Sequence, residues 1–403
     1  MVFKSRKFKT VQTRYLQYIK VEKEFIPLSV PNISGNELKY VSETIETEWV
    51  SSVGSYVEQF EKEFAKYIGS KYAIAVVNGT AAIHISLIIA GVEQDDEVLV
   101  PNLTFVAPVN AVMYCKAIPV FVDSEWKTLG MDPRIVADFI RNETEFKNGF
   151  TINKKTGRKV KAIVPMHTLG NAVDMDGFLD LCKERNIVVI EDASESLGSE
   201  YKGLKTGNIG DLACFSFNGN KIITAGGGGM ITTNNEAYAK RAKHISTTAK
   251  TDAIYFDHDE VGYNYRMVNV VAALGVAQLE RIEEFVDIKR KNLQKYSTLL
   301  GENAQFFIHQ EPLHGKSNCW MYSLVRKETC KYTVDELIKK FAEEKIQVRP
   351  IWKLMSELSM FANFQKIGGA ISKDIASRVV NIPCSTNLTE NHIKRVVEVI
   401  AGE

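Results

Sequence analysis

Short apolar segments alternate with longer amphipathic ones over residues 36–200. The short segments are rich in β-branched side chains, and each is bounded by Gly, Pro, Asn or Asp, as is typical of strands that end in turns. They span residues 73–77, 97–100, 120–122, 161–164 and 187–190. A helix is predicted over residues 56–67, where large apolar side chains recur at helical spacing. This alternation predicts an α/β fold with a mostly parallel sheet, which binds ligands beyond the carboxyl ends of its strands.

Three further stretches define the expected domain organisation. Residues 141–160 are polar and predict a surface excursion. A long amphipathic helix, predicted from about residue 268 to residue 300, leads away from the α/β region. We therefore expect a basic leader over residues 1–24, a large domain over 25–280, and a smaller α+β C-terminal domain over 281–403.

Composition narrows the class of protein. With 45% hydrophobic residues, 25% charged residues and a formal net charge of +1, the chain gives no electrostatic reason to expect nucleic acid or an anionic membrane as a partner. It has no apolar run long enough to span a membrane. Six scattered cysteines without a CxxC pair predict buried thiols in a reducing cytoplasm, with no disulfide and no metal site.

The first 24 residues are basic but have no apolar signal-peptide core. We expect a solvated leader helix there, and a contact with phosphate or a membrane surface is the alternative.

A first candidate for chemistry is the segment Asn78-Gly79-Thr80-Ala81-Ala82, which follows a predicted strand and opens a predicted helix. Free N–H groups at a helix N-terminus bind phosphate well, Gly79 permits close approach, and Thr80 adds a hydroxyl. A threonine N-cap without any ligand explains the same segment equally well. The segment alone therefore leaves both interpretations open.

A second candidate is the pair Glu191-Asp192 at the end of an apolar strand. Two carboxylates are costly to bury there unless each has a partner. The pyridinium N–H of pyridoxal phosphate is such a partner, because an adjacent anion keeps the ring protonated. We assign this role to Asp192. A helix cap or an ion pair with a lysine is the alternative.

A third candidate is Lys221, which ends the turn Ser216-Phe217-Asn218-Gly219-Asn220-Lys221 and precedes four consecutive glycines. A lysine amine can form an imine with a carbonyl and then move protons. The glycines do not form a dinucleotide-binding fingerprint, because residues 230–233 read as a strand rather than a helix. An ordinary surface lysine is the alternative.

Five motifs in order resemble the DegT/StrS-type sugar aminotransferases, from about Phe25 to Val399. They are NGTAAIH, PNLTFVAPVNAV, VIEDASESLGSEYKG, CFSFNGNKIITAGGGGMITT and VGYNYRM…ALGVAQLE. The resemblance implies a fold-type-I (aspartate aminotransferase-like) enzyme that uses pyridoxal phosphate. Further segments, WVSSVG, TLGMDP and HDEVGYNYRM, are similar to the legionaminic-acid-pathway branch. Its members aminate C4 of a UDP-linked 4-keto-6-deoxy-N-acetylhexosamine.

The resemblance also implies roles for individual residues. Lys221 matches the Schiff-base lysine, and Asp192 matches the partner of the ring nitrogen. The remaining matches are Gly79, Thr80 and Ser216 for the phosphate, Phe105 stacked on the ring, Glu195 near the ring hydroxyl, and Asn264 reaching the phosphate of the neighbouring subunit. Asn264 thus implies a homodimer with shared active sites. One departure is Asn218, because many relatives have a histidine there, so no proton-transfer role is carried over to this position.

We therefore expect transamination of a nucleotide-linked keto-sugar with L-glutamate as donor. The alternatives are a GDP-4-keto-6-deoxymannose (perosamine-type) aminotransferase, a sugar dehydratase, a non-catalytic regulator that binds pyridoxal phosphate, and a nicotinamide-dependent oxidoreductase. Lys221 argues against the dehydratase, whose branch lacks this lysine, and the missing three-glycine fingerprint argues against the oxidoreductase. His84 is expected in the core or an interface. His167, Trp320 and Trp352 stay open between structural and substrate-facing roles.

Overall fold

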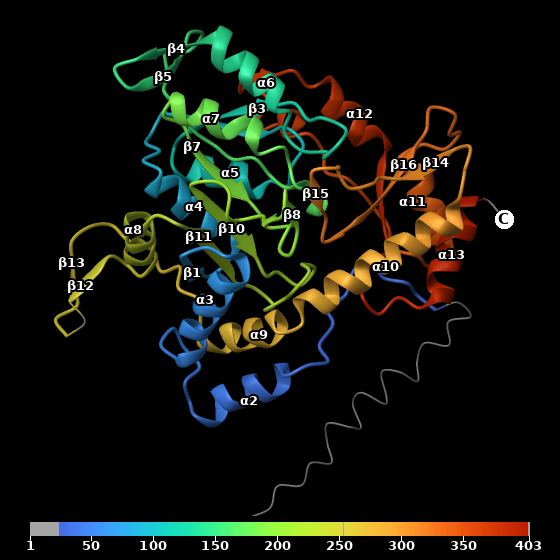
Figure 1. Cartoon of the computed structure of the whole chain (residues 1–403), viewed down its shortest axis with the longest axis horizontal. Coiled ribbons are helices and arrows are strands. Elements are labelled where there is room, and N and C mark those ends of the chain that lie inside the picture. The colour runs from blue at the N-terminus through green and yellow to red at the C-terminus, as the bar shows by residue number, and fades with distance from the viewer. Residues whose placement is uncertain (1–23, 253, 402–403) are drawn as a thin grey trace, which may run out of the picture.

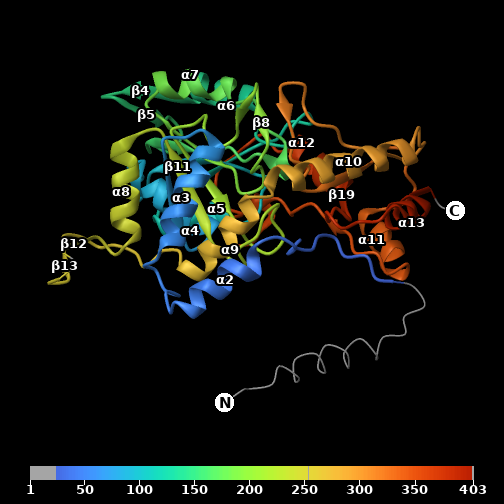
Figure 2. The same ribbon diagram turned by 60° about the horizontal axis from the view of Figure 1, so that its bottom comes forward.

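A computed structural model describes residues 24–252 and 254–401 of the chain. The predicted basic leader therefore lies outside the described residues, except for Glu24. A central sheet with helices on both sides forms one part of the molecule, and a smaller C-terminal unit lies beside it (Figures 1 and 2). Within the described residues, none of the helices combines the length and the apolar character needed to cross a membrane.

The central sheet has eight strands in the order β1-β11-β10-β7-β6-β2-β3-β18. Strand β11 is antiparallel to both of its neighbours, whereas the other pairs are parallel, so the prediction of a mostly parallel sheet is confirmed. The strands are β1 (Tyr72–Val76), β2 (Glu97–Pro101), β3 (Ile118–Val122), β6 (Val160–Ile163), β7 (Val188–Asp192), β10 (Leu212–Ser216), β11 (Gly229–Thr233) and β18 (Lys366–Ile367).

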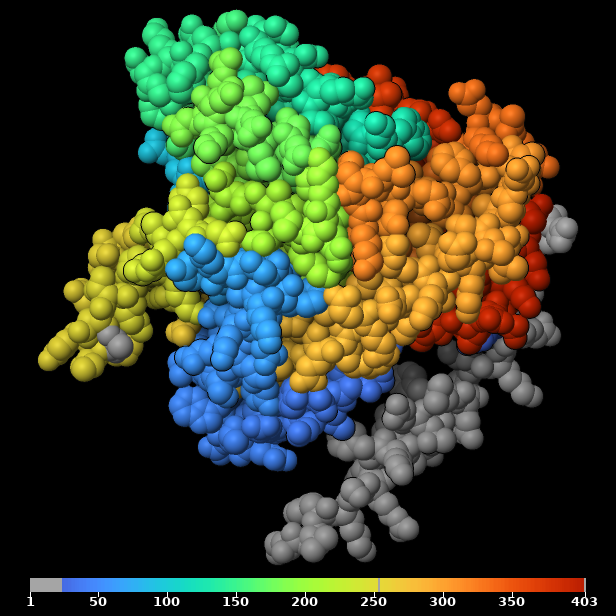
Figure 3. Space-filling model, in the orientation of Figure 1, coloured from blue at the N-terminus to red at the C-terminus, as the bar shows by residue number. Residues whose placement is uncertain are grey.

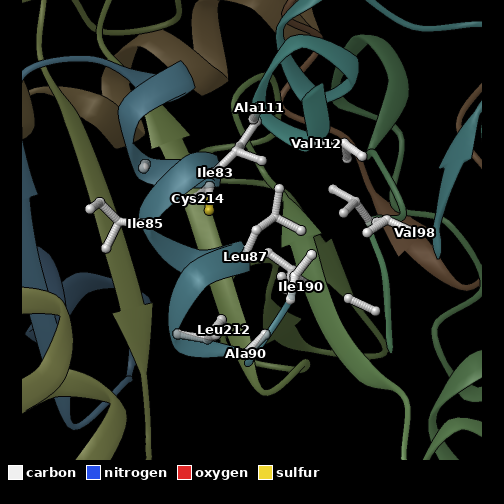
Figure 4. Close-up of a cluster of buried hydrophobic side chains, with 14 of the residues drawn as sticks. Ile83, Ile85, Leu87, Ala90, Val98, Ala111, Val112, Ile190, Leu212 and Cys214 are labelled. Carbon is white, nitrogen blue, oxygen red and sulfur yellow. The ribbon is translucent and has the colours of Figure 1, made fainter. Parts of the chain in front are cut away.

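Helices cover both faces of this sheet. Helices α4 (Gly79–Ile89), α5 (Ala107–Tyr114) and α8 (Glu236–Ser246) pack on one face. Figure 4 shows side chains of α4, Ile83 and Leu87, among Val98 and Ile190 from the sheet. The other face carries α3 (Ser55–Ile68), α6 (Pro133–Asp138), α7 (Asp176–Glu184) and α9 (Asn269–Leu279). Burial on both faces explains why the parallel strands are nearly continuous apolar runs.

The C-terminal unit is built on a four-stranded antiparallel sheet in the order β14-β16-β19-β17. Its strands are β14 (Phe306–Ile308), β16 (Tyr322–Arg326), β17 (Arg349–Pro350) and β19 (Val379–Ile382). Helices α10 (Ile282–Leu300), α11 (Val334–Glu343) and α13 (Glu390–Ala401) pack against it, and so does Ile26 from the beginning of the described chain. Because Ile26 joins this unit while β18 joins the central sheet, the chain crosses between the two parts more than once. The domain boundary at residue 280 stays a prediction.

The single helix predicted over residues 268–300 is wrong, because two helices occupy this stretch. Helix α9 ends at Leu279, α10 begins at Ile282, and Arg281 between them has a non-helical backbone. Helix α9 lies against α2 (Glu37–Glu46) and α3, whereas α10 lies against α13 of the C-terminal unit. The two helices thus serve different cores, and no Gly or Pro at residues 280–281 marks the break.

Short elements complete the fold at its periphery. The polar stretch 141–160 contains a π-helical turn (Phe139–Glu143) followed by the hairpin β4 (Thr144–Lys147) and β5 (Phe150–Asn153). A second hairpin, β12 (Lys250–Asp252) and β13 (Asp257–His258), projects from the body of the molecule (Figures 1 and 3). The remaining elements are β8 (Glu200–Tyr201), β9 (Leu204–Lys205), β15 (Gly315–Lys316), α12 (Ala370–Arg378) and the 3₁₀ turns Thr168–Gly170 and Met355–Glu357.

Candidate active site

A cavity of about 290 Å³ opens where β7 and β10 end and α4 begins. Its lining includes seven of the eight residues singled out in the sequence: Gly79, Thr80, Phe105, Asp192, Glu195, Ser216 and Lys221. The eighth, Asn264, is exposed and does not line the cavity of its own chain. Side chains up to 142 positions apart in the sequence therefore meet at the carboxyl edge of the sheet, where α/β proteins bind ligands.

The N-terminus of α4 forms one end of the cavity. Asn78 is the N-cap, and its Oδ1 accepts a hydrogen bond from the N–H of Ala81 at 2.8 Å. The threonine N-cap considered from the sequence is therefore not formed, and Thr80 lies inside the first turn instead. The first N–H groups of a helix have no partners within it, so the N–H groups of Gly79 and Thr80 suit an anion. A Cβ atom on Gly79 would lie 2.8 Å from Cβ of Ser216, which explains the glycine.

Asp192 and Glu191 point into different surroundings. Asp192 lines the cavity, and its Oδ1 accepts a hydrogen bond from the N–H of Ser194 at 3.1 Å. Burial raises the pKa of Asp192, which is only 2% exposed. A cation beside this carboxylate would relieve the cost of burying its charge. A pyridinium N–H is such a group, so Asp192 fits the pyridoxal phosphate ring.

Glu191 is held by the protein itself. Its oxygens accept hydrogen bonds from the N–H groups of Gly207, Ile209 and Gly210 and from Nε2 of His167 at 2.9 Å. Burial alone would raise the pKa of Glu191, but His167 and these amides lower it. Nδ1 of His167 accepts the N–H of Val173, so both ring nitrogens are occupied. The open question about His167 is thus answered, because it is a structural histidine that braces Glu191.

Lys221 lies between a carboxylate and an aromatic ring. Its Nζ is 3.7 Å from Oε1 of Glu195 and 4.1 Å from the centroid of the Trp320 ring. The other carboxylate oxygen of Glu195 accepts the N–H of Leu169 at 2.9 Å. Burial raises the pKa of Glu195 to about 7, although the Lys221 amine opposes this shift. A carboxyl poised near neutral pH next to a lysine is well suited to share a proton with it.

Aromatic side chains form the walls of the cavity. Trp320 and Trp352, whose roles the sequence left open, both line it, and they come from the C-terminal unit. Phe105, in the loop between β2 and α5, lines the same cavity and is 55% exposed, so a flat ligand can reach its ring. Sequence reasoning left both tryptophans open between core and site, because a tryptophan in a small α+β unit is as often a core residue. Residues that sequence reasoning did not assign here include Asn78, Met166 and Asn220.

His84 does not line the cavity. It is buried in an aromatic cluster with Tyr114, Tyr263 and Tyr265, and burial lowers its pKa. This matches the expectation of a core or interface histidine.

The residues of the cavity therefore fit pyridoxal phosphate in three respects. The helix N-terminus suits the phosphate, the buried Asp192 suits the ring nitrogen, and Lys221 presents an amine between them and the tryptophans. All of these groups belong to one cavity.

Comparisons with known proteins agree with this chemistry. A family model described as the DegT/DnrJ/EryC1/StrS aminotransferase family matches residues 31–401. The chain is 37% identical over 379 residues to EpsN of Bacillus subtilis (strain 168), provisionally named a pyridoxal phosphate-dependent aminotransferase; the match covers 93% of this chain and 95% of EpsN. It is 35% identical over 378 residues to the GDP-perosamine synthase of Escherichia coli O157:H7, covering 94% and 98% of the two chains.

The fold is also shared with a solved structure. PseC of Helicobacter pylori, an aminotransferase involved in the biosynthesis of pseudoaminic acid, superposes with a TM-score of 0.84 at 21% identity, over 94% of this chain and 99% of PseC. The fold, the cavity and the sequence relatives thus agree. The chain belongs to the DegT/DnrJ/EryC1/StrS aminotransferase family, and it is a pyridoxal-phosphate-dependent sugar aminotransferase.

Proposed function

We propose that the protein moves the amino group of L-glutamate to the keto carbon of a nucleotide-linked 4-keto-6-deoxy sugar. One observation carries this proposal. The amine of Lys221, the buried carboxylate of Asp192 and the N-terminus of α4 surround a single cavity with aromatic walls. A proton-transfer group, an anion for a ring nitrogen and an anion-binding site are the three things that transamination with pyridoxal phosphate requires.

Pyridoxal phosphate, when bound, supplies a carbonyl that captures the amino group and a ring that accepts the electrons of the broken bond. The chain supplies the rest. Nζ of Lys221 would take the proton from the α-carbon of the amino donor and deliver it to the carbon that was the carbonyl carbon of the cofactor. The carboxylate of Asp192 holds a proton on the ring nitrogen. The Glu195 carboxylate, with Oε1 3.7 Å from Nζ, stabilises the positive charge on Lys221 while the lysine carries the proton. A general acid–base group contributes typically ~10²–10⁴-fold in rate.

The walls of the cavity suit a sugar ring. Trp352 offers an apolar face besides Phe105, which we assign to the cofactor ring, and Asn218 and Asn220 offer polar groups in the lining of the same cavity. Apolar walls with a few polar groups are typical of small-molecule sites. Asn218 occupies the position where many relatives have histidine, so we assign it a hydrogen-bonding role and no proton transfer.

Two sugar nucleotides are candidates. The segments WVSSVG, TLGMDP and HDEVGYNYRM favour a UDP-linked 4-keto-6-deoxy-N-acetylhexosamine, as in the legionaminic-acid-pathway branch. The similarity to a GDP-perosamine synthase over nearly the full chain favours GDP-4-keto-6-deoxymannose. We place the UDP-linked sugar first, because its support comes from three separate segments of this sequence.

We also propose that two copies of the chain share their active sites. Asn264 is exposed and lies on the strand-like segment that pairs with Thr247, near the foot of the projecting hairpin. The tip of this hairpin exposes Ile254, Tyr255 and Phe256 by 79%, 83% and 69%. Large apolar side chains at a projecting tip are typical of a contact with another protein. In a homodimer, this contact would bring Asn264 toward the partner's cavity.

Two experiments test the proposal. Incubation with L-glutamate alone should convert the bound cofactor to its amine form and yield 2-oxoglutarate, which separates an enzyme from a non-catalytic regulator. Incubation with L-glutamate and a panel of UDP- and GDP-linked keto-sugars, followed by mass spectrometry, should then show an amino-sugar nucleotide for one of them. A product lighter by one water and without added nitrogen would indicate dehydration instead, and no product from any sugar would refute the proposed substrate class.

A further inference from the structure

Trp320 makes two separate contacts with the lysine turn. Its indole Nε1–H donates a hydrogen bond to the carbonyl oxygen of Asn220 at 2.7 Å, and Asn220 directly precedes Lys221. Its ring lies under the Lys221 ammonium, with Nζ 4.1 Å from the centroid. A cation within about 6 Å of an indole face is attracted to it, most strongly away from water. Trp320 is 4% exposed, so this contact is shielded.

The position of the Trp320 ring is fixed by its neighbours. Its backbone N–H donates to Oδ1 of Asn318 at 2.8 Å, and Nδ2 of Asn318 donates to the carbonyl oxygens of Glu195 and Leu197 at 3.0 and 2.9 Å. Asn318 is fully buried. A single asparagine thus binds the main chain of both residues whose side chains contact the amine, Trp320 and Glu195.

We infer that Trp320 is a positioning residue for Lys221, and that its indole face together with the Glu195 carboxylate forms the resting place of the free lysine amine. This inference rests on the proposed role of Lys221 in proton transfer. The amine is free during that transfer, and a long flexible side chain must then be kept in one place. The ring binds the ammonium form, Glu195 neutralises it, and the hydrogen bond to Asn220 holds the turn from which the side chain extends.

The charged groups around Lys221 are few in the described part of the chain. Asp192 and Glu195 line the cavity with it, and Lys289 lines a small hollow on the other side, where its Nζ donates to the carbonyl of Cys384. These three groups are unchanged when Trp320 is replaced. Trp320→Phe and Trp320→Leu both lack the hydrogen bond to Asn220, so a difference between them in the affinity of Lys221 for its proton reports on the ring face.

The test uses the full chain freed of cofactor, so that it needs neither a sugar nor a donor. The reactivity of Lys221 toward acetic anhydride is followed against pH by peptide mass spectrometry, which gives the apparent pKa of its amine. We expect the apparent pKa of the Lys221 amine to fall in the order wild type, Trp320→Phe, Trp320→Leu. The value for Trp320→Leu should lie below that of the wild type by about 0.5 or more, because indole binds cations best and leucine has no π face.

Trp126 offers a matched control. Its ring also lies beside a cation, with Cζ of Arg378 at 4.9 Å, and its Nε1–H also donates a hydrogen bond, in this case to the carboxylate of Asp374, but it does not line the cavity. Trp126→Phe and Trp126→Leu should leave the pKa of Lys221 unchanged. The inference is overturned if Trp320→Leu matches the wild type, or if Trp126→Leu shifts the pKa equally. Should Trp320→Leu fail to fold, Trp320→Phe decides, since a value equal to the wild type would overturn the inference.

Discussion

Lys221, Asp192 and Glu195 lie in one cavity, but the protein surrounds each of them differently. Asp192 is almost fully buried and accepts a hydrogen bond from its own chain at Ser194. Glu195 is fixed through one oxygen by the N–H of Leu169 and leaves the other for Lys221. The residue Leu169 has a positive φ of 55°, which is uncommon for a leucine and is held by this contact. The three side chains therefore have distinct chemical tasks despite their proximity.

Replacing Lys221 with alanine tests the central residue. We expect Lys221→Ala to abolish measurable turnover while the protein stays folded, because the side chain serves the cavity and not a hydrophobic core. Turnover with L-glutamate and the accepted sugar, together with a thermal unfolding curve, checks this. Lys240→Ala is the control, since Lys240 is an exposed lysine paired with Glu236 on the surface of α8. Activity of Lys221→Ala within tenfold of the wild type would refute the assignment.

The raised pKa of Glu195 predicts a pH-dependent stability. Between the ordinary value of 4.5 and about 7, the folded state binds more protons at this carboxyl than the unfolded state does. The contribution of Glu195 to the free energy of unfolding is therefore largest at low pH and is lost as the pH rises through about 7. Glu195→Gln removes this dependence, because an amide does not ionise.

We expect the Tm of cofactor-free Glu195→Gln to exceed that of the wild type increasingly from about pH 5 to about pH 8. Differential scanning calorimetry at several pH values measures the gap. The same comparison for Glu236→Gln, at an exposed position of α8, serves as control. A gap that is constant across this range would show that Glu195 ionises normally in the folded protein.

At the residue scale, motifs carried most of the information available from the sequence. Five ordered motifs identified the cofactor and the enzyme class, which the comparisons confirm. The choice of Asp192 over Glu191 was made before the family resemblance, which then agreed with it; alternation along a strand places one of two adjacent side chains in the cavity without saying which. The contacts of Trp320 with Asn220 and of Asn318 with Glu195 could not be predicted, because in each case the two residues are 100 or more positions apart in the sequence.

The first turn of helix α4 forms part of the site, and its cap and its neighbouring strand hold it in place. Its N-cap, Asn78, satisfies the N–H of Ala81, while Gly79 and Thr80 of the first turn line the cavity. Strand β11 starts directly beside this turn, and a Cβ on Gly229 would lie 2.5 Å from the carbonyl of Asn78. The last glycine of the four-glycine run therefore allows the strand and the helix start to meet.

Removing the cap tests this element. Asn78→Ala should lower the free energy of unfolding by about 0.5–2 kcal/mol and weaken the retention of pyridoxal phosphate several-fold, because the first turn frays where the phosphate binds. Asn235→Ala is a matched control, since Asn235 caps α8 through Ala237 and Tyr238 but lies outside the cavity. Denaturant unfolding and dialysis followed by cofactor absorbance measure the two effects. Equal loss of cofactor from both variants would contradict a role of the cap in binding.

The elements themselves were predicted unevenly. Strands bounded by turn residues were recognised because each is a short apolar run between Gly, Pro, Asn or Asp. The break between α9 and α10 was missed, since the apolar pattern continues through residues 280–281 while the cores on either side differ. Periodicity reports that a face is buried, but it does not report which neighbour buries it.

At the scale of the whole molecule, the cavity combines both parts of the fold. The central sheet supplies Lys221 and Asp192, and the C-terminal unit supplies the two tryptophans. The two parts are linked at the site itself, because Trp320 donates a hydrogen bond to the turn that carries Lys221. The one candidate residue outside this cavity, Asn264, would take part only in the proposed homodimer, through the cavity of the partner.

Mixing two inactive variants tests whether active sites are shared between subunits. In a shared site, Lys221 comes from one chain and Asn264 from its partner, so a dimer of Lys221→Ala with Asn264→Ala keeps one site in which both residues are intact. Random reassociation of equal amounts should thus restore about a quarter of the wild-type activity, from half of the dimers with one good site each. This result requires that Asn264→Ala alone be strongly impaired, which the same assay records.

The control mixes Lys221→Ala with Asp192→Ala, because both residues line the cavity of one chain and each site of the mixed dimer then lacks one of them. No restoration with Asn264→Ala would show that each chain works with its own residues alone, and restoration in the control would show that Lys221 and Asp192 do not serve the same site.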